Sequence, residues 1–365
     1  MSTHASSVRG RFYAYDNLKF LLILFVVIGH FADELTVNLY GQYSGDPTLP
    51  VSDIFNSIYI FLYAFHMPLF MFVSGLFHKT ADGNDGVRAI RYLILGILLK
   101  LLLFSSNTAF RTDFDKDKPV NFSLFGGDGA YWYLVALAAF TAISYAVRNA
   151  DPRAVMGFSL LLTLYAGYDS SIGDDFTLSR ILIFFPFFYA GAISDPERVY
   201  SFFKKAYIRI VGVLIIAVWA YLCFSRLELV YPLRKLFTGR NSYYSVSETT
   251  GMDIEFWHRL LCTGISALLC IAFLALMINV RIPFVSAAGA RTLQIYFWHR
   301  TVLYFLMYIN YPQKLAHYFP DHFKVYYVLT AAAVTFILAF KPFGAPLNAV
   351  IKAIGSSSKD KREVR

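Results

Sequence analysis

The sequence is poor in charged residues and in cysteine. Asp, Glu, Lys and Arg make up 16% of its 365 residues, whereas soluble domains carry about 25%. The three cysteines, Cys223, Cys262 and Cys270, lie in apolar runs without metal-ligand spacing. We therefore expect free thiols, no disulfide framework and no metal site. Walker, HExxH and CxxC motifs are also absent, as is a GxGxxG motif after a strand.

Apolar residues are abundant instead. Hydrophobic residues account for 57% of the chain and aromatic residues for 18%, and the mean hydropathy is +0.50. A water-soluble fold cannot bury that much Phe, Leu and Ile, so we predict a polytopic membrane protein. The first apolar run, over 18–35, has no small-residue cleavage site after it and is expected to be retained as a helix.

The apolar runs predict the number of membrane helices. A helix needs about 20 apolar residues to cross the hydrocarbon core, and at this apolarity helices are the only spanning structure expected. We therefore predict an all-α bundle of about ten transmembrane helices. The predicted segments are 18–37, 54–77, 89–106, 130–147, 154–168, 178–194, 207–225, 259–279, 285–308 and 324–341.

The positions of the charges predict the orientation. With ten spans and a cytoplasmic N-terminus, the cytoplasmic segments carry an excess of Lys and Arg and the outer segments an excess of acidic residues. This bias explains the net charge of +9 without a nucleic-acid partner. We expect a cytoplasmic N-terminus over 1–17, a single membrane domain over 18–354, and a disordered cytoplasmic tail over 355–365.

Two long outer loops are predicted, over 105–129 and 226–258. Long loops on one face suit the recognition of a ligand, although each is equally well interpreted as a simple linker. The chain has no convincing internal repeat, which makes a transporter less favoured.

Three histidines are predicted to lie near the middle of the bilayer. His30 and His66 lie about 18 Å and His299 about 21 Å from the ends of their predicted helices, at 1.5 Å per residue. Ionisable residues at that depth are costly and are candidates for function. The alternative for each is a hydrogen-bonded structural histidine.

His30 has the most informative neighbours. Asp33 and Glu34 follow it at i+3 and i+4, the spacings that share a helix face. A carboxylate there is able to hold one ring nitrogen and leave the other as a base. Otherwise both carboxylates lie at the water interface and touch nothing. Lys19, at the inner end of the same helix, is able to snorkel to the headgroups.

Two further groups of residues stand out. Pro68, just after His66, frees the carbonyl of Ala64 and predicts a kink, and the following Ser74-Gly75 pair permits close helix contact. Arg88 and Arg91 are three residues apart and are able to clamp a phosphate group, although topology alone also predicts cytoplasmic arginines.

Several motifs resemble one known family in their order. They are Tyr15-Asp16-Asn17-Leu18-Lys19 leading to Gly29-His30, Phe65-His66-Met67-Pro68-Leu69-Phe70 through Ser74-Gly75, Trp132-Tyr133-Leu134, Phe185-Pro186-Phe187-Phe188 with Gly191, and Ile295-Tyr296 with His299. They resemble the acyltransferase 3 family of integral-membrane O-acyltransferases, in the branch of fucose 4-O-acetylase-like sugar acetyltransferases. Lys19 replaces the commoner Arg of the first motif, and Arg88 and Arg91 match the family's basic cluster only loosely.

The resemblance implies a mechanism. An acyl-CoA, usually acetyl-CoA, would bind from the cytoplasm of a bacterial cell at its inner membrane. The acyl group would pass to a hydroxyl of a sugar or glycan, with His30 as the base. The remaining candidates are Asp33, Glu34 and His66 beside that base, Lys19, Arg88 and Arg91 for the CoA phosphates, and Trp132, His299 and Arg300 for the acceptor.

Other functions stay open from the sequence. The alternatives within the same fold are a succinyl or longer acyl group, and a lipid, peptidoglycan or small molecule as the acceptor. A different class of function is a proton-coupled glycan or solute transporter, with His30 and His66 as proton relays. A third is a purely structural membrane partner.

Overall fold

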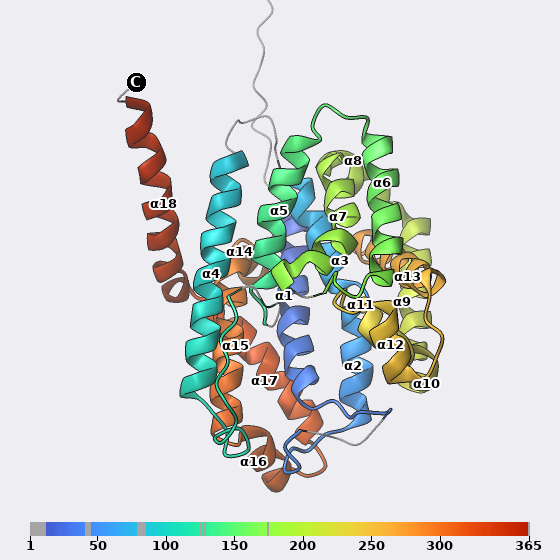
Figure 1. Cartoon of the computed structure of the whole chain (residues 1–365), viewed down its shortest axis with the longest axis vertical. Coiled ribbons are helices and arrows are strands. Elements are labelled where there is room, and N and C mark those ends of the chain that lie inside the picture. The colour runs from blue at the N-terminus through green and yellow to red at the C-terminus, as the bar shows by residue number, and fades with distance from the viewer. Residues whose placement is uncertain are drawn as a thin grey trace, which may run out of the picture.

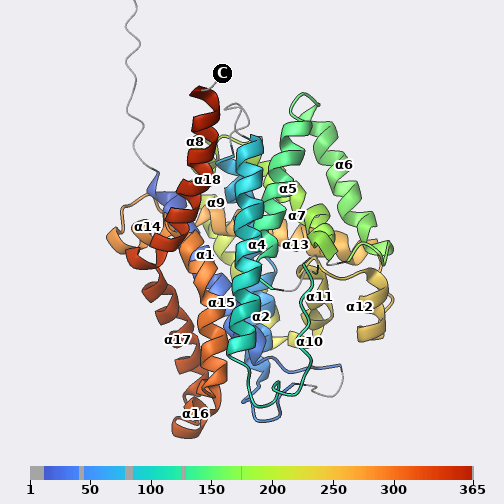
Figure 2. The ribbon, with the colours of Figure 1, turned by 60° about the vertical axis from the view of Figure 1, so that its left-hand side comes forward.

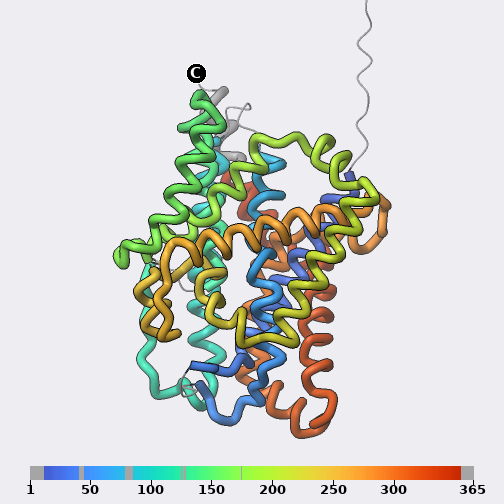
Figure 3. Tube along the Cα trace, turned by 90° about the vertical axis from the view of Figure 1, so that its right-hand side faces the viewer, coloured from blue at the N-terminus to red at the C-terminus, as the bar shows by residue number. Residues whose placement is uncertain are grey.

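The structure is a computed structural model that describes residues 12–40, 45–78, 85–124, 126, 129–173 and 175–363, with side chains as far as residue 354. Within these ranges the chain is all-α, with no strand. Most of the long helices run roughly along the long axis of the molecule, and α13 crosses them (Figures 1 and 3).

The helices agree with the apolar segments of the sequence. Eight predicted segments each coincide with one helix, and two coincide with a pair of consecutive helices. The single helices are α1 (Tyr13–Glu34), α4 (Asp85–Ala109), α5 (Trp132–Ala146), α6 (Pro152–Tyr165), α7 (Leu178–Ala192), α9 (Ala206–Ser225), α13 (Phe256–Ala275) and α17 (Phe323–Leu338). The pairs are α2 (Asp53–Tyr63) with α3 (His66–Leu76) and α14 (Pro283–Gly289) with α15 (Thr292–Tyr308).

Not all of these helices are long and apolar enough to span a membrane alone. In the described part of the chain, four meet that description: α1, the α2–α3 pair, α9 and α13. Two sharply bent pairs raise the number to six if each pair is one span, namely α7 with α8 (Pro196–Phe203) and the pair over 323–354. The helical membrane bundle is thus confirmed, whereas the count of ten stays a prediction.

Apolar side chains also cover the outside of the bundle. Helix α9 is the most apolar candidate span, yet only 17% of its apolar window is buried. Ile210, Leu214 and Val218 on α9 and Leu329 on α17 are more than half exposed. Such a surface is stable against lipid and not against water.

The first turn of α1 and the last helix, α18 (Ala345–Glu363), lie at the same end of the bundle (Figure 2). Helix α16 (Tyr311–Tyr318) lies at the opposite end (Figure 1). The predicted cytoplasmic side of both termini and the predicted disorder of 355–365 stay predictions.

The predicted kink at Pro68 is confirmed as the break between α2 and α3. Proline cannot donate to the carbonyl four residues earlier, which is that of Ala64. The hydroxyl of Ser266 on α13 donates to that carbonyl over 2.5 Å. The partner from another helix satisfies the freed backbone group, as an apolar surrounding requires.

The predicted close contact at Gly75 is confirmed between α3 and α7. A Cβ atom built on Gly75 would lie 1.9 Å from the carbonyl oxygen of Phe188, and one on Gly191 would lie 2.0 Å from that of Phe72. The two backbones therefore touch at both glycines, which fixes the walls of the cavities described below.

We expect Gly75→Ala to destabilise the protein because the new methyl group forces the backbones of α3 and α7 apart. Overpacking of this kind costs about 1–3 kcal/mol. Thermal unfolding in detergent should show a midpoint several degrees below that of the wild type. Gly157→Ala on α6 is the matched control, because no atom lies within 4 Å of its added Cβ. Equal midpoints for the two variants would contradict the close contact.

Candidate functional site

A cavity of about 370 Å³ lies among α1, α3, α4, α5, α7 and α15, and we call it the Lys19 cavity. Its lining is mostly apolar and aromatic. The basic side chains that line it are Lys19, His78 and Arg88, of which Lys19 is on α1 and Arg88 is near the start of α4. Arg91 is not among the lining residues.

The charged groups of the Lys19 cavity have acidic neighbours. Lys19 Nζ lies 2.9 Å from Asp16 Oδ1, and Arg88 Nη2 lies 3.4 Å from Asp85 Oδ1. Burial lowers the pKa of His78 below 6.5, and the Arg88 charge lowers it further, against the smaller opposite effect of Asp85. The lowered pKa favours neutral His78, and the other two basic groups of the described lining are Lys19 and Arg88.

A second cavity of about 120 Å³ is lined by half of the sequence-predicted site residues, and we call it the His30 cavity. Its lining includes His30, Asp33, His66, Trp132 and Arg300. These residues come from α1, α3, α5 and α15, so the fold gathers them from positions up to 270 residues apart in the sequence. Glu34 and His299 are not among the lining residues.

The two cavities adjoin. Val26, Met67 and Tyr296 line both of them. Val26 lies on α1 just before His30, and Met67 directly follows His66. His30 and His66 therefore lie near the boundary between the two cavities.

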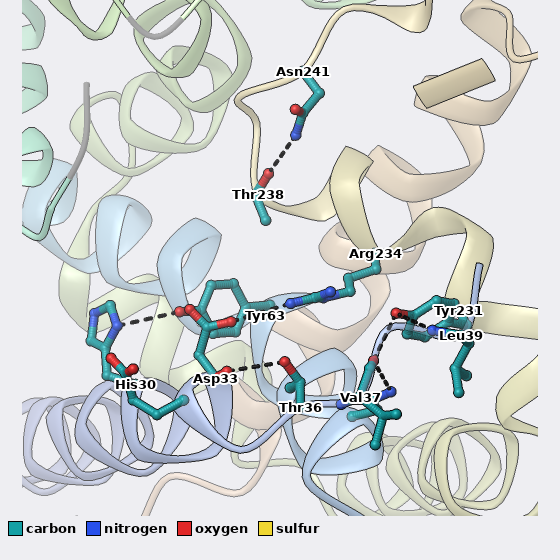
Figure 4. Close-up of polar contacts among 12 residues, drawn as sticks. His30, Asp33, Thr36, Val37, Leu39, Tyr63, Tyr231, Arg234, Thr238 and Asn241 are labelled. Carbon is teal, nitrogen blue, oxygen red and sulfur yellow. Dashed lines mark hydrogen bonds and ion pairs between the residues drawn. The ribbon is translucent and has the colours of Figure 1, made fainter. Parts of the chain in front are cut away.

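His30 is held between two aromatic rings. Its Nδ1 lies 3.4 Å from Tyr63 Oη on α2 (Figure 4). The His30 ring also stacks on that of His299, with the centroids 5.1 Å apart and the planes at 30°. His299 therefore contacts His30 rather than the cavity itself.

The backbone orients the other two histidine rings. His66 Nδ1 lies 2.6 Å from the carbonyl oxygen of Leu62, and His299 Nδ1 lies 2.7 Å from that of Tyr296. A carbonyl only accepts hydrogen bonds, so in each neutral ring Nδ1 carries the proton and Nε2 has a lone pair.

The carboxylates next to His30 have partners other than the expected one. Asp33 Oδ1 lies 3.2 Å from Arg234 Nη2, on α11 (Arg234–Phe237) (Figure 4). Glu34 Oε1 lies 3.1 Å from Arg300 Nη1. The expectation that one of them holds the His30 ring is corrected, because the hydrogen-bond partner of that ring is Tyr63. A guanidinium group competes better for a carboxylate than a neutral imidazole does.

The structure adds residues that the sequence did not reveal. Tyr59, Tyr63, Arg180 and Arg240 also line the His30 cavity. The Arg180 guanidinium lies 4.7 Å from the centre of the Trp132 ring. A charged residue inside the predicted 178–194 segment was the available signal for Arg180. Arg240 lies in the predicted outer loop 226–258, so that loop does contribute to the site.

Lys100 fixes a loop beside the His30 cavity. It is nearly fully buried in α4, and its Nζ donates to the carbonyl of Leu124 over 3.1 Å, to that of Gly126 and to the hydroxyl of Tyr131. Gly129 and Ala130, just beyond, line the His30 cavity. The buried charge thus ties the end of the 105–129 loop to the site.

No group of three or more His, Cys, Asp or Glu suited to a metal ion occurs among the described residues. The three cysteines, Cys223, Cys262 and Cys270, are buried free thiols, as predicted.

Comparison with known proteins adds one match. A family model described as the acyltransferase domain matches residues 12–343, which include all of the candidate site residues. No curated protein and no solved structure matches the chain. The apolar helical bundle agrees with the integral-membrane character of that family. The match covers most of the chain, and the protein therefore belongs to the acyltransferase 3 family.

Proposed function

We propose that the protein transfers an acetyl or other short acyl group from acyl-CoA to a hydroxyl of a surface glycan or of its lipid-linked precursor. The observation that carries this proposal is the contact between the Lys19 and His30 cavities at Val26, Met67 and Tyr296. We place the enzyme in the bacterial inner membrane, with the Lys19 cavity toward the cytoplasm.

Acyl-CoA suits the Lys19 cavity in charge and in polarity. CoA is a phosphate-bearing thiol, and Lys19 and Arg88 offer two cations at the same cavity. Beyond these cations the lining is apolar, with aromatic residues such as Phe70 and Tyr133. The thioester end of the donor would then lie near Met67, next to His66.

We assign base catalysis to the His30 cavity. His30 takes the proton of the acceptor hydroxyl, and the resulting oxygen nucleophile attacks the thioester carbonyl. The carbon–oxygen bond forms and the carbon–sulfur bond breaks, so the CoA thiolate leaves and takes up a proton. An imidazole suits this step because its unperturbed pKa of about 6.5 makes it largely neutral at pH 7.

Neighbouring residues have supporting roles in this proposal. Tyr63 and His299 hold the ring of His30 from two sides. Trp132 and Arg300 line the space for the acceptor. Asp33 and Glu34 support the site by their ion pairs with Arg234 and Arg300 rather than by holding the His30 ring.

We expect His30→Ala to abolish transfer of labelled acetyl groups from acetyl-CoA to a glycan panel. General-base catalysis contributes about 10²–10⁴-fold, so kcat should fall by at least that lower limit. The variant should still bind acetyl-CoA, because His30 does not line the Lys19 cavity.

The control for this experiment is His317→Ala, which changes an exposed histidine on α16. It should keep wild-type activity. Transfer that survives in folded His30→Ala would contradict the base assignment, and absence of acetyl-CoA binding by the wild type would contradict the donor.

We expect Arg88→Met to raise the KM for acetyl-CoA with little change in kcat. The loss of one charge-assisted phosphate contact corresponds to about tenfold. Arg153→Met is the control, because Arg153 is an exposed arginine at the start of α6. A kcat effect without a KM effect, or the same effect in both variants, would contradict the phosphate role.

A further inference from the structure

A third cavity, of about 390 Å³, lies beyond the His30 cavity, and we call it the Asn107 cavity. It is lined by the ends of α1, α4 and α15, by the start of α16 and by parts of the loops over 45–49 and 112–118. These segments lie at the end of the bundle opposite to α18 (Figure 1).

The Asn107 cavity adjoins the His30 cavity at one shared residue. Asp33 lines both. The Glu34–Arg300 ion pair spans the wall between them, because Glu34 lines the Asn107 cavity and Arg300 lines the His30 cavity. An acceptor with its hydroxyl at His30 would therefore extend into the Asn107 cavity.

Loop contacts give the Asn107 cavity a defined wall. Arg111 donates to the carbonyls of Asp115 and Lys118, and Thr112 Oγ1 donates to Asp115 Oδ2 over 3.0 Å. On the other side Gln313 Nε2 donates to Thr48 Oγ1 over 3.2 Å. These contacts hold loop segments that are far apart in the sequence around one space.

The lining combines the groups that bind neutral sugars. Amide and hydroxyl groups from Asn107, Thr112 and Gln313 lie beside the aromatic rings of Phe110 and Phe114. The Gln313 Oε1 atom is buried and has no hydrogen-bond partner among the described residues. A buried acceptor without a partner is costly, and a sugar hydroxyl is a donor that would satisfy it.

The charges disfavour an anionic ligand. Among the described lining residues are four carboxylates, Asp33, Glu34, Asp46 and Asp115, and one cation, Lys118. The arginines paired with Asp33 and Glu34 are not among these described lining residues. Sites for phosphate or carboxylate groups use arginine or lysine in excess, so a sugar nucleotide or a uronic acid fits this cavity poorly.

We propose that the Asn107 cavity is a subsite for a second, neutral sugar unit, so that the acceptor is an oligosaccharide or a longer glycan rather than a monosaccharide or a sugar nucleotide. This inference rests on the proposed function. The sizes support it, since the His30 cavity has about 120 Å³ and the Asn107 cavity about 390 Å³. Most of an acceptor longer than one ring therefore belongs in the Asn107 cavity.

The test compares acceptors of one, two and three units. Purified protein is given labelled acetyl-CoA and matched mono-, di- and trisaccharides of glucose, galactose, mannose and rhamnose, with UDP-glucose as the anionic probe. Saturation-transfer NMR on the same sugars measures their binding independently of transfer. A preference of about tenfold in kcat/KM or in affinity for di- over monosaccharide is expected, because one or two added hydrogen bonds supply that much.

Variants test whether the preference for longer acceptors depends on the Asn107 cavity. The double variant Asn107→Ala, Gln313→Ala should lose the preference for longer acceptors while keeping kcat on the monosaccharide. Thr108→Ala is the matched control, because Thr108 neighbours Asn107 and is not among the lining residues. Acetyl-CoA binding is measured for every variant, so that loss of the enzyme function is distinguished from loss of the subsite.

Three results would overturn the subsite. One is equal kcat/KM and affinity for mono- and trisaccharides. Another is an unchanged length preference in the double variant. The third is binding of acetyl-CoA by a protein that neither binds nor acetylates any of the neutral sugars. Failure to bind acetyl-CoA would instead count against the proposed function.

Discussion

The interior of the bundle depends on one constraint: a polar group surrounded by apolar helices must find its partner within the protein. Several polar groups near the candidate site meet that demand with partners that the structure defines. His66 on α3 uses the Leu62 carbonyl of α2, His299 uses a carbonyl of its own helix, and the carbonyl freed by Pro68 uses Ser266. Lys100 uses loop carbonyls. The same contacts that satisfy the interior therefore also fix the rings and loops around the His30 cavity.

This constraint explains why so much of the fold was predictable from the sequence. Long apolar runs can be located directly in the sequence as membrane helices, and all ten predicted segments coincide with helices. The consequences of Pro68 and Gly75 also follow from local chemistry, because a proline frees a known carbonyl and a glycine permits close contact. The number of complete spans was less predictable, since several helices are short or bent.

The sequence indicated several members of the candidate site but not their pairings. His30, His66 and Arg300 were singled out in apolar segments and Trp132 through the family resemblance, and the fold brings all four to one cavity. The ion-pair partners of Asp33 and Glu34 are Arg234 and Arg300, which lie about 200 and 266 residues further along the chain. Helix periodicity describes neighbours within one helix and carries no information on such contacts. Arg240 was missed for the same reason, as it lies in a loop.

In the proposed function the arrangement of the cavities separates the donor from the acceptor. The cations proposed to bind CoA line one cavity, and the polar and acidic groups proposed to bind neutral sugars line another, with His30 in the cavity between them. We therefore propose that the acyl group passes from one side of the membrane to the other through the junction at Val26, Met67 and Tyr296.

The most direct test of that claim uses sealed vesicles that contain the protein, with labelled acetyl-CoA enclosed inside and a glycan acceptor outside. The account predicts labelled acceptor outside intact vesicles, and none when His30→Ala replaces the wild type. Labelling that begins only after detergent opens the vesicles would contradict transfer across the membrane, because donor and acceptor would then have to meet on the same side.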